Sequence, residues 1–307
     1  MNNPRLSGIL PQLSLLVASL LWASSFIALK LAFVHYHPMV VIAGRMVVGS
    51  LCFLFLPQVF RGVKILKTDI RPLALMVLVE PCLYFIFEAK ALGLTTASQA
   101  GMITALCPLM VSFAAFFLLG ERLTHRNIVG MVISVVGACW LSIAGQASAT
   151  ATAPNPALGN FFEFLAMVCA AGYGILLKQL TNRGYNPLFL TALQAFAGSI
   201  FFLPALFFPS TVMPTTIEPV SALAVLYLGS VVTLGAYGCY SFGVSRIPAG
   251  QASSFINLIP VFTLIMGMAI LNETLNAWQY LACILVFGGI FLSQHRGRKP
   301  VVASVVK

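Results

Sequence analysis

Three side chains that can carry charge or form hydrogen bonds recur at four-residue spacing in one apolar stretch of the sequence. They are Glu80, Tyr84 and Glu88, and the stretch covers residues 72–90. Residues four apart lie on the same side of an α-helix, so these three could line a cavity and contact a substrate. Glu80 directly precedes Pro81, which removes a backbone hydrogen bond. It could instead be a structural acid bonded to a carbonyl group that the proline leaves free.

Polar side chains at helical spacing also occur in two later apolar stretches. Thr233, Tyr237 and Tyr240 lie in the first, and Ser253 and Asn257 lie in the second. They could face the same cavity as Glu80. They could equally join neighbouring helices, because Ser, Thr and Asn form hydrogen bonds between helices in lipid. The spacing alone leaves both interpretations open.

Two basic residues and one more acid stand out in apolar surroundings. Lys30 lies close to the end of its stretch, where a long side chain can reach the membrane surface. Arg45 lies deeper and needs a partner, and Glu88 is the nearest acid at that depth. Glu163 is expected to begin a helix, where a carboxylate interacts favourably with the helix dipole.

The composition indicates which environment surrounds these apolar stretches. Of the 307 residues, 60% are apolar and 8% are charged, whereas about 25% of the residues in an average soluble chain are charged. Disorder is excluded as well, because it requires low hydrophobicity and high charge density. The chain is therefore expected to be an all-α protein of the membrane. Its seven cysteines fall in apolar stretches without a CxxC pair, and we expect them to be apolar fillers rather than disulfides or metal ligands.

The apolar stretches are long enough to cross a bilayer, which takes about 20 helical residues. Ten transmembrane helices are predicted, with boundaries accurate to a few residues. They cover approximately residues 13–33, 39–57, 72–90, 96–118, 127–144, 160–180, 187–208, 220–242, 249–271 and 277–294.

The basic residues support this number of helices. With ten spans, both termini and the even-numbered loops share one side, which carries 13 of the 17 Lys and Arg residues. The loops on the other side carry Lys90 alone, and Lys30, Arg45 and Lys178 lie within spans. Basic loops face the cytoplasm, so both termini are expected to be cytoplasmic. The uncharged segment 147–157 is then an external linker.

The two halves of the sequence repeat each other. Gln99, Pro108, Glu121 and Gly137 reappear as Gln251, Pro260, Glu273 and Gly289, at a constant offset of 152 residues. The match is weaker nearer the start of each half: Lys30 resembles Lys178 at an offset of 148 residues, and Pro38 and Gly49 resemble Pro187 and Gly198 at an offset of 149. We expect a first repeat in residues 1–146 and a second in residues 158–307, which ends in a basic cytoplasmic tail.

Each repeat holds five helices, so the second must enter the membrane in the opposite direction. Inverted repeats are a recurrent architecture of secondary transporters, whose substrate site lies near the membrane midplane. Pro108 and Pro260 occupy equivalent positions in the middle of a span. They could be tolerated kinks, but their symmetric placement favours a pair of hinges. Replacing one or the other by Ala should then bias the protein in opposite directions.

Three short segments resemble a known family. The segments are 21–26 (LWASSF), 118–123 (LLGERL) and 270–275 (ILNETL). Together with the duplicated five-helix unit, they resemble the EamA-type drug/metabolite transporter superfamily over roughly residues 10–295. The second copy has Asn272 where the first has Gly120. The resemblance implies a YddG-like exporter of amino acids or other small metabolites, with a cavity lined largely by helices 3, 4, 8 and 9.

The function expected from these observations is secondary transport without a cofactor. No HExxH, GxSxG or Walker A pattern occurs, so neither a metal site nor an enzyme is expected. The expected partners are a small-molecule substrate and the lipid bilayer of a plasma membrane, such as a bacterial inner membrane, and not nucleic acid. We expect a monomer or a weak homodimer, and proton coupling stays open. The expected substrate-binding residues are Glu80, Tyr84, Glu88, Thr233, Tyr237, Tyr240, Ser253 and Asn257.

Alternatives to amino-acid export remain. Glu80 as a counter-charge, with Tyr84, Tyr237 and Tyr240 as aromatic faces, would also suit an exporter of quaternary ammonium cations or other drugs. A membrane-embedded enzyme or a receptor would require catalytic clusters or large extramembrane loops, and the sequence shows neither.

Overall fold

The fold was obtained as a computed structural model, which describes residues 4–119, 124–146, 150–246 and 255–294. Within these ranges the chain is helical, and the one β-type pairing is an isolated bridge between Thr150 and Ala153. Glu121 and Ser253, both named in the sequence analysis, lie outside the described residues.

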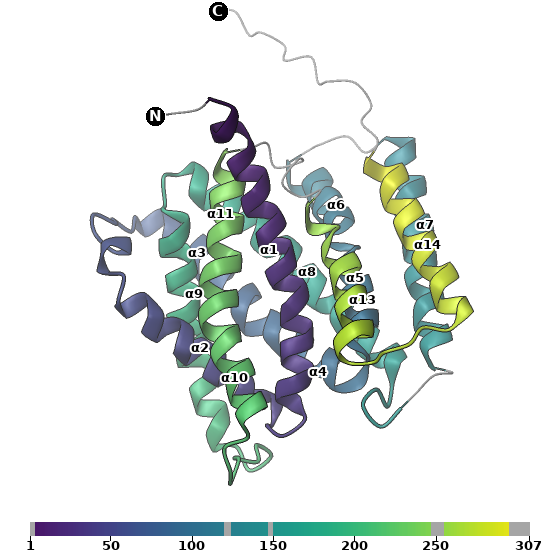
Figure 1. The fold of residues 1–307 in the computed structure, drawn as a ribbon. Helices are drawn as coiled ribbons and strands as arrows, with labels where there is room; N and C mark the ends of the chain where they lie inside the picture. The colour runs from purple at the N-terminus through teal and green to yellow at the C-terminus, as the bar shows by residue number, and fades with distance from the viewer. Residues whose placement is uncertain (1–3, 120–123, 147–149, 247–254, 295–307) are drawn as a thin grey trace, which may run out of the picture.

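The helices form an upright bundle (Figure 1). In chain order they are α1 (Pro4–Phe33), α2 (Pro38–Leu54), α3 (Ile70–Val77), η3 (Leu78–Leu83), α4 (Tyr84–Leu94), α5 (Ala97–Thr104), α6 (Cys107–Leu119), α7 (His125–Gln146), α8 (Pro156–Asn182), α9 (Pro187–Phe202), α10 (Pro219–Tyr227), η5 (Leu228–Ala236), α11 (Tyr237–Arg246), α13 (Ile259–Ile270) and α14 (Ala277–Gln294). Short 3₁₀ turns η1 (Pro57–Val59), η2 (Lys67–Asp69) and η4 (Leu203–Phe207) lie between them. Within the described residues, seven spans are long and apolar enough to cross a membrane and three shorter apolar helices accompany them. The all-α, multi-span prediction is confirmed.

Two helix starts share one sequence signal. Asn155 precedes Pro156 at the start of α8, and Asn186 precedes Pro187 at the start of α9. Each asparagine side chain accepts a hydrogen bond from a backbone N–H of the first turn. Proline suits the first helical position because its missing N–H would have no partner there. These caps fix where α8 and α9 begin.

Small residues allow α7 and α14 to pack closely. A Cβ atom on Gly130 would lie 2.5 Å from the carbonyl oxygen of Gly289, and the Ser134 hydroxyl donates a hydrogen bond to the carbonyl of Val286 (3.1 Å). Small residues serve this purpose in membranes, where close backbone approach replaces the hydrophobic effect. Gly137 and Gly289, which the 152-residue offset relates, both lie in this interface.

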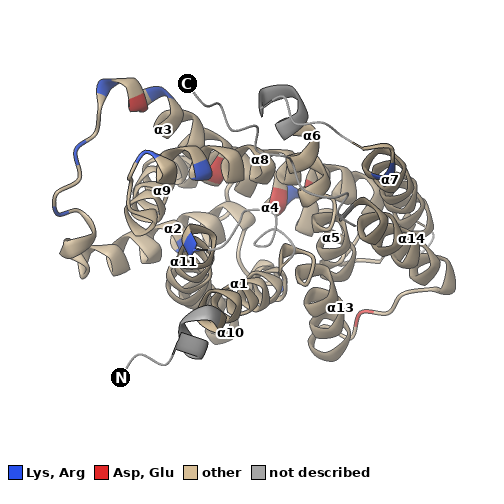
Figure 2. Ribbon diagram, turned by 90° about the horizontal axis from the view of Figure 1, so that it is seen from above, with Lys and Arg blue, Asp and Glu red and all other residues tan. Residues whose placement is uncertain are grey.

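The outer surface of the bundle is apolar. Ile143 of α7 and Ile200 of α9 are 73% and 74% exposed. Viewed from above, the bundle carries few charged residues, and some of these lie inside it near α4 (Figure 2). A lipid environment accounts for both features, because lipid accepts exposed apolar side chains and disfavours charge.

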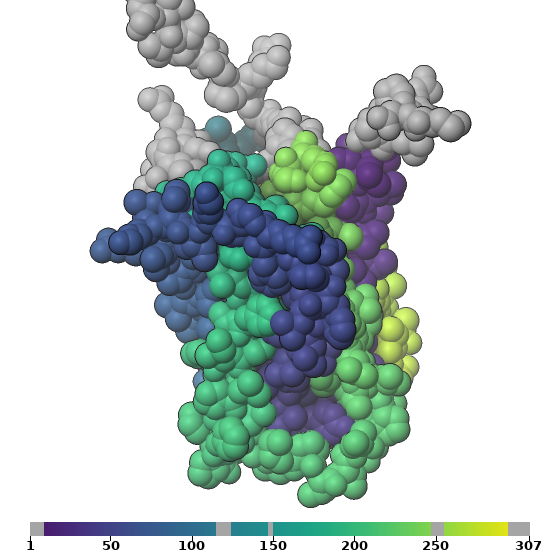
Figure 3. Space-filling model, turned by 90° about the vertical axis from the view of Figure 1, so that its left-hand side faces the viewer, coloured from purple at the N-terminus to yellow at the C-terminus, as the bar shows by residue number. Residues whose placement is uncertain are grey.

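One end of the bundle, which we call the basic end, carries the start of α1. At this end Arg183, just after α8, forms an ion pair with Asp69 of η2. Tyr185 donates a hydrogen bond to the same carboxylate (2.9 Å). The segment between α2 and α3 crosses this part of the molecule beside α9 (Figure 3), and the rings of Phe60 and Phe189 lie 6.3 Å apart. The ion pair therefore joins the first half of the chain to the second.

A vestibule of about 840 Å³ also lies at the basic end. It lies between the start of α1, the end of α11 and the turn that joins α8 to α9. Its polar lining includes Ser14, Thr181, Asn186, Ser241, Ser245 and Arg246.

At the opposite, distal end, Glu273 of the second half bonds to the first half, and Lys30 bonds to the segment between the halves. Both carboxylate oxygens of Glu273 accept hydrogen bonds from the N-terminus of α5, from the backbone N–H groups of Ala97 and Ser98 (2.8 Å each). The Lys30 ammonium donates to the carbonyl oxygen of Thr152 (2.8 Å). Lys30 therefore reaches a loop at the end of the bundle, in keeping with its expected position near the membrane surface.

Candidate functional site

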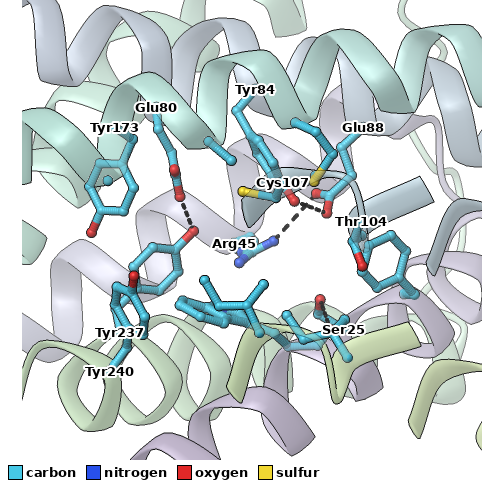
Figure 4. A pocket seen from close by; sticks show the side chains of 17 residues that line it. Ser25, Arg45, Glu80, Tyr84, Glu88, Thr104, Cys107, Tyr173, Tyr237 and Tyr240 are labelled. Atoms are coloured by element: carbon cyan, nitrogen blue, oxygen red, sulfur yellow. Dashed lines mark hydrogen bonds and ion pairs between the residues drawn. The ribbon is translucent and has the colours of Figure 1, made fainter. Parts of the chain in front are cut away.

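A cavity of about 80 Å³ lies inside the bundle, between helices from both halves of the chain (Figure 4). Its polar lining consists of Ser25, Arg45, Glu80, Tyr84, Glu88, Thr104, Cys107, Tyr173, Tyr237 and Tyr240. Ligand pockets commonly enclose about 300–1,000 Å³. The cavity is therefore smaller than a typical ligand pocket.

Glu80 lies where the third span stops being α-helical. Its backbone is extended (φ −146°, ψ 119°) within the π-type turn η3. The carboxylate accepts a hydrogen bond from the Tyr237 hydroxyl, and the backbone carbonyl accepts one from the Gln194 side chain (3.0 Å). The prediction that Glu80, Tyr84 and Glu88 share the side of one continuous α-helix is therefore wrong. All three nevertheless line the cavity.

Arg45 and Glu88 form a buried ion pair, with 3.9 Å between Nη1 and Oε2. The pairing expected from their common depth is confirmed. The other oxygen of Glu88 accepts a hydrogen bond from Tyr84 (2.9 Å). The guanidinium of Arg45 also lies over the ring of Phe85, 4.3 Å from its centre.

Aromatic rings form one wall of the cavity. The Trp22 ring lies 5.4 Å from that of Tyr237 and 4.9 Å from that of Tyr240. Tyr173 packs edge-on against Tyr237, with ring centres 6.3 Å apart. Because Tyr237 also contacts Glu80, the aromatic wall lies beside an acidic group.

Five of the eight expected substrate-binding residues line the cavity together, namely Glu80, Tyr84, Glu88, Tyr237 and Tyr240. Thr233 does not. Its hydroxyl donates to the Leu228 carbonyl (2.9 Å), and it lines a smaller pocket beside Glu80. Asn257 is not among the lining residues either, although Ile256 and Ile259 are. Its side-chain oxygen is buried, without a hydrogen-bond partner in the described part of the chain.

Glu163 does not lie in the first turn of a helix. Because α8 begins at Pro156, Glu163 falls in its third turn and is fully buried. The expected interaction with the helix dipole is therefore wrong, since that effect is confined to the first turn. Neither carboxylate oxygen has a hydrogen-bond partner among the described residues.

Both prolines that were expected to be hinges lie at breaks in a span. Pro108 is the second residue of α6, after a break at residues 105–106 that ends α5. Pro260 is the second residue of α13, after a turn at residues 257–258. The helices are thus discontinuous at equivalent places in the two halves. Bending at these places stays a prediction.

A second pair of breaks also follows the repeat. The offset of 149 residues maps the π-type turn η3 onto residues 227–232, which overlap η5. Interrupted helices in corresponding positions of two halves are the usual sign of a transporter's binding site. The same offset relates Ser25 to Gly174 and Glu88 to Tyr237, and all four line the cavity.

Among the lining residues that the sequence analysis missed are Trp22, Thr104, Cys107 and Tyr173. Aromatic and small residues are common in apolar spans, so their type alone did not distinguish them. Continuing the 149-residue offset from Ser25 to Gly174 would have drawn attention to this region, because Tyr173 directly precedes Gly174 and Trp22 lies three residues before Ser25.

Comparison with known proteins places this architecture in a family. The family model described as EamA-like transporter family matches residues 9–143 and again residues 157–294. A crystal structure of a protein that is 22% identical shares the fold, with a TM-score of 0.64, and covers 92% of this chain and 96% of that one.

Proteins of similar sequence are named as transporters. "Uncharacterized transporter YetK" of Bacillus subtilis is 27% identical over 207 residues, which are 67% of this chain and 62% of YetK. "Probable terminal-alkyne amino-acid exporter" of Streptantibioticus cattleyicolor is 24% identical over 65% of each chain. The duplicated family match, the helical bundle and these relatives show that the chain is a multi-pass membrane transporter of the EamA-like transporter family.

Proposed function

We propose that the protein is a secondary transporter that exports small zwitterionic metabolites, with amino acids as the leading class, across a plasma membrane. One observation carries this proposal: the central cavity contains the basic side chain of Arg45 and the acidic side chain of Glu80 beside an aromatic wall. An amino acid offers a carboxylate and an ammonium group to two such side chains. The relative named as an amino-acid exporter supports the same substrate class.

The arrangement of the two ends supports a mechanism of alternating access. The distal end is closed by Glu273 and Lys30, whereas the basic end carries a large vestibule. Tyr240 of the cavity is followed in α11 by Ser241 of the vestibule, so α11 contributes to both. Exchange of conformation between the inverted halves would then open the distal end and close the basic end.

A second candidate is export of a quaternary ammonium cation. Glu80 contacts Tyr237, and Tyr173 and Trp22 offer further aromatic faces. Such faces bind quaternary ammonium groups. The guanidinium of Arg45 in the same cavity opposes a substrate with only positive charge, which ranks this candidate second.

Uptake by purified protein in liposomes tests both candidates. Liposomes preloaded with an unlabelled compound would be offered the same compound in labelled form, with amino acids in one series and quaternary ammonium compounds in the other. Exchange of amino acids is the expected result. Exchange confined to the cations would replace the first candidate by the second. Repeating the assay with and without a pH gradient tests proton coupling.

The variant Glu80→Gln tests the site itself. Loss of the charged hydrogen bonds to the ammonium group is expected to reduce exchange about tenfold or more. Glu218→Gln is the matched control, because it neutralises a carboxyl group at the distal end, outside the cavity. Unchanged exchange by Glu80→Gln would assign Glu80 a structural role.

A further inference from the structure

Arg45 has hydrogen-bond donors that no group in the described part of the chain uses. Its side chain is 2% exposed, yet neither Nε nor Nη1 has a hydrogen-bond partner in the described residues. A guanidinium group carries five N–H donors and no acceptor. Buried donors without a partner are rare and costly. Arg45 also lines the cavity, and a partner that is absent from the protein itself would complete its hydrogen bonding.

Glu88 balances the charge of Arg45 without occupying its donors. The 3.9 Å between Nη1 and the nearest carboxylate oxygen is too long for a hydrogen bond. Glu88 instead bonds to Tyr84 at 2.9 Å. Phe85 lies beneath the guanidinium and covers one of its faces. An anion would therefore approach the rim of the guanidinium, where the N–H groups point.

Arg45 also lies between the two acidic contacts of the cavity. Figure 4 shows it with the Glu80–Tyr237 contact on one side and the Tyr84–Glu88 contact on the other. Glu80 and Arg45 are close enough to interact electrostatically. A ligand with adjacent positive and negative groups could thus contact both residues at once.

We propose that Arg45 binds the carboxylate group of the transported amino acid, while Glu80 and Tyr237 bind its ammonium group. This inference rests on the proposed function and deepens it. Guanidinium–carboxylate hydrogen bonds are charge-assisted and among the strongest in proteins. Arg45 therefore determines specificity: it favours amino acids over amines of the same shape. The apolar residues Phe26, Ile256 and Ile259 also line the cavity, which makes leucine a suitable test ligand.

Three compounds that share the side chain of leucine test the contributions of the carboxylate and the ammonium group separately. Leucine has both groups, 3-methylbutylamine lacks the carboxylate, and 4-methylpentanoate lacks the ammonium group. Binding to the purified full chain would be followed by the fluorescence of Trp22, which lines the cavity. The other two tryptophans, Trp140 and Trp278, would be replaced by Phe. The unsubstituted cavity is expected to bind leucine about 10- to 100-fold more tightly than either analogue.

Substitutions of Arg45 should abolish this preference. Arg45→Gln is expected to lower leucine affinity about 10- to 100-fold, to the level of 3-methylbutylamine, and to leave the amine's affinity equal or higher. Arg45→Lys keeps the charge but loses the planar donors, so an intermediate affinity is expected. Lys90→Gln is the matched control: it removes a cation from the same region of the bundle, but Lys90 is exposed, near the ring of Phe162.

Glu88→Gln provides a test that does not depend on Arg45 variants folding. It leaves the free donors of Arg45 in place and removes the anion nearest to them. Binding of 4-methylpentanoate should therefore become at least about tenfold tighter. An unchanged affinity for this acid would show that Arg45 only neutralises Glu88.

The outcomes distinguish this inference from the proposed function. If the unsubstituted protein binds leucine but Arg45→Gln weakens leucine and the amine equally, or weakens neither, the role of Arg45 is overturned and amino-acid transport stands. If neither leucine nor any other amino acid binds or exchanges, the proposed function fails and the inference fails with it.

Discussion

Glu163 differs from Glu80 and Glu88 because its carboxyl group has no hydrogen-bond partner among the residues that the structure describes. Glu80 bonds to Tyr237, and Glu88 bonds to Tyr84 and pairs with Arg45. The oxygens of Glu163 are buried and unpaired within the described part of the chain. It lies one turn before Met167, a lining residue of α8, and its carboxyl group interacts electrostatically with that of Glu88. An unpaired buried polar group reduces stability, so Glu163 is expected to cost folding free energy.

Replacing Glu163 by leucine should therefore stabilise the protein. Removing an unsatisfied buried group recovers about 1–3 kcal/mol, and the midpoint of thermal unfolding in detergent should rise. Glu88→Leu is the matched control and should lower the midpoint, because it leaves Arg45 buried without its anion, at a cost of about 3–5 kcal/mol. A lower midpoint of thermal unfolding in both variants would mean that Glu163 has a stabilising partner, and the argument above would be wrong.

At the scale of helices, breaks in the spans place polar groups inside an apolar bundle. The interruption at η3 exposes the backbone carbonyl of Glu80 to Gln194 and directs its carboxylate toward Tyr237. The break between α5 and α6 leaves a short helix whose N-terminus is held by Glu273. Non-helical backbone at membrane depth is tolerated where it is buried in protein or lines a cavity. The breaks therefore coincide with the site and with the closure of the distal end.

Neutralising Glu273 should weaken the closure of the distal end. Glu273→Gln removes the negative charge that accepts both bonds from the N-terminus of α5, where the helix dipole also favours an anion. Charged hydrogen bonds contribute about 1.5–3 kcal/mol each, so the balance of states should shift at least about tenfold toward opening at that end.

The native Cys107, which lines the cavity, can report this shift. With the other six cysteines replaced, its reaction with a membrane-impermeant thiol reagent would be measured from each side. Glu273→Gln should increase labelling from the distal side. Glu218→Gln, also at the distal end, is the control and should leave it unchanged. Equal labelling in all variants would show that Glu273 does not hold this end closed.

At the scale of the whole molecule, the number of spans could be predicted from the sequence. The side of each helix that faces the cavity could not. Apolar length and the position of basic loops depend on composition along the chain, which the sequence displays directly. Thr233 and Asn257 were placed in the cavity by spacing, yet neither lines it. Periodicity shows which residues share a side of a helix, but tertiary packing decides which side faces the cavity.

Helix boundaries limited the prediction in a different way. The sequence analysis began the sixth span near residue 160, but the Asn155–Pro156 cap begins α8 four residues earlier. That shift moves Glu163 from the first turn into the buried interior. Acids in apolar stretches, by contrast, were recognisable by type alone: Glu80 and Glu88 both line the cavity.

The direction of transport depends on which side of the membrane each end faces. Arg183 and Arg246 lie at the basic end together with the start of α1, and loops rich in Lys and Arg remain in the cytoplasm. The basic end is therefore expected to face the cytoplasm. Its vestibule would then admit substrate from inside the cell, as export requires.

Cysteine labelling in intact cells tests this orientation. In a background without the seven native cysteines, Ala151→Cys should react with an impermeant maleimide added outside, because Ala151 is exposed in the loop at the distal end. Lys64→Cys lies in the exposed loop at the basic end and should react only after the cells are permeabilised. The opposite pattern would reverse the assignment: the vestibule would then open to the outside, and the closed distal end would face the cytoplasm. In that case the structure would represent an importer's loading state or an exporter's release state.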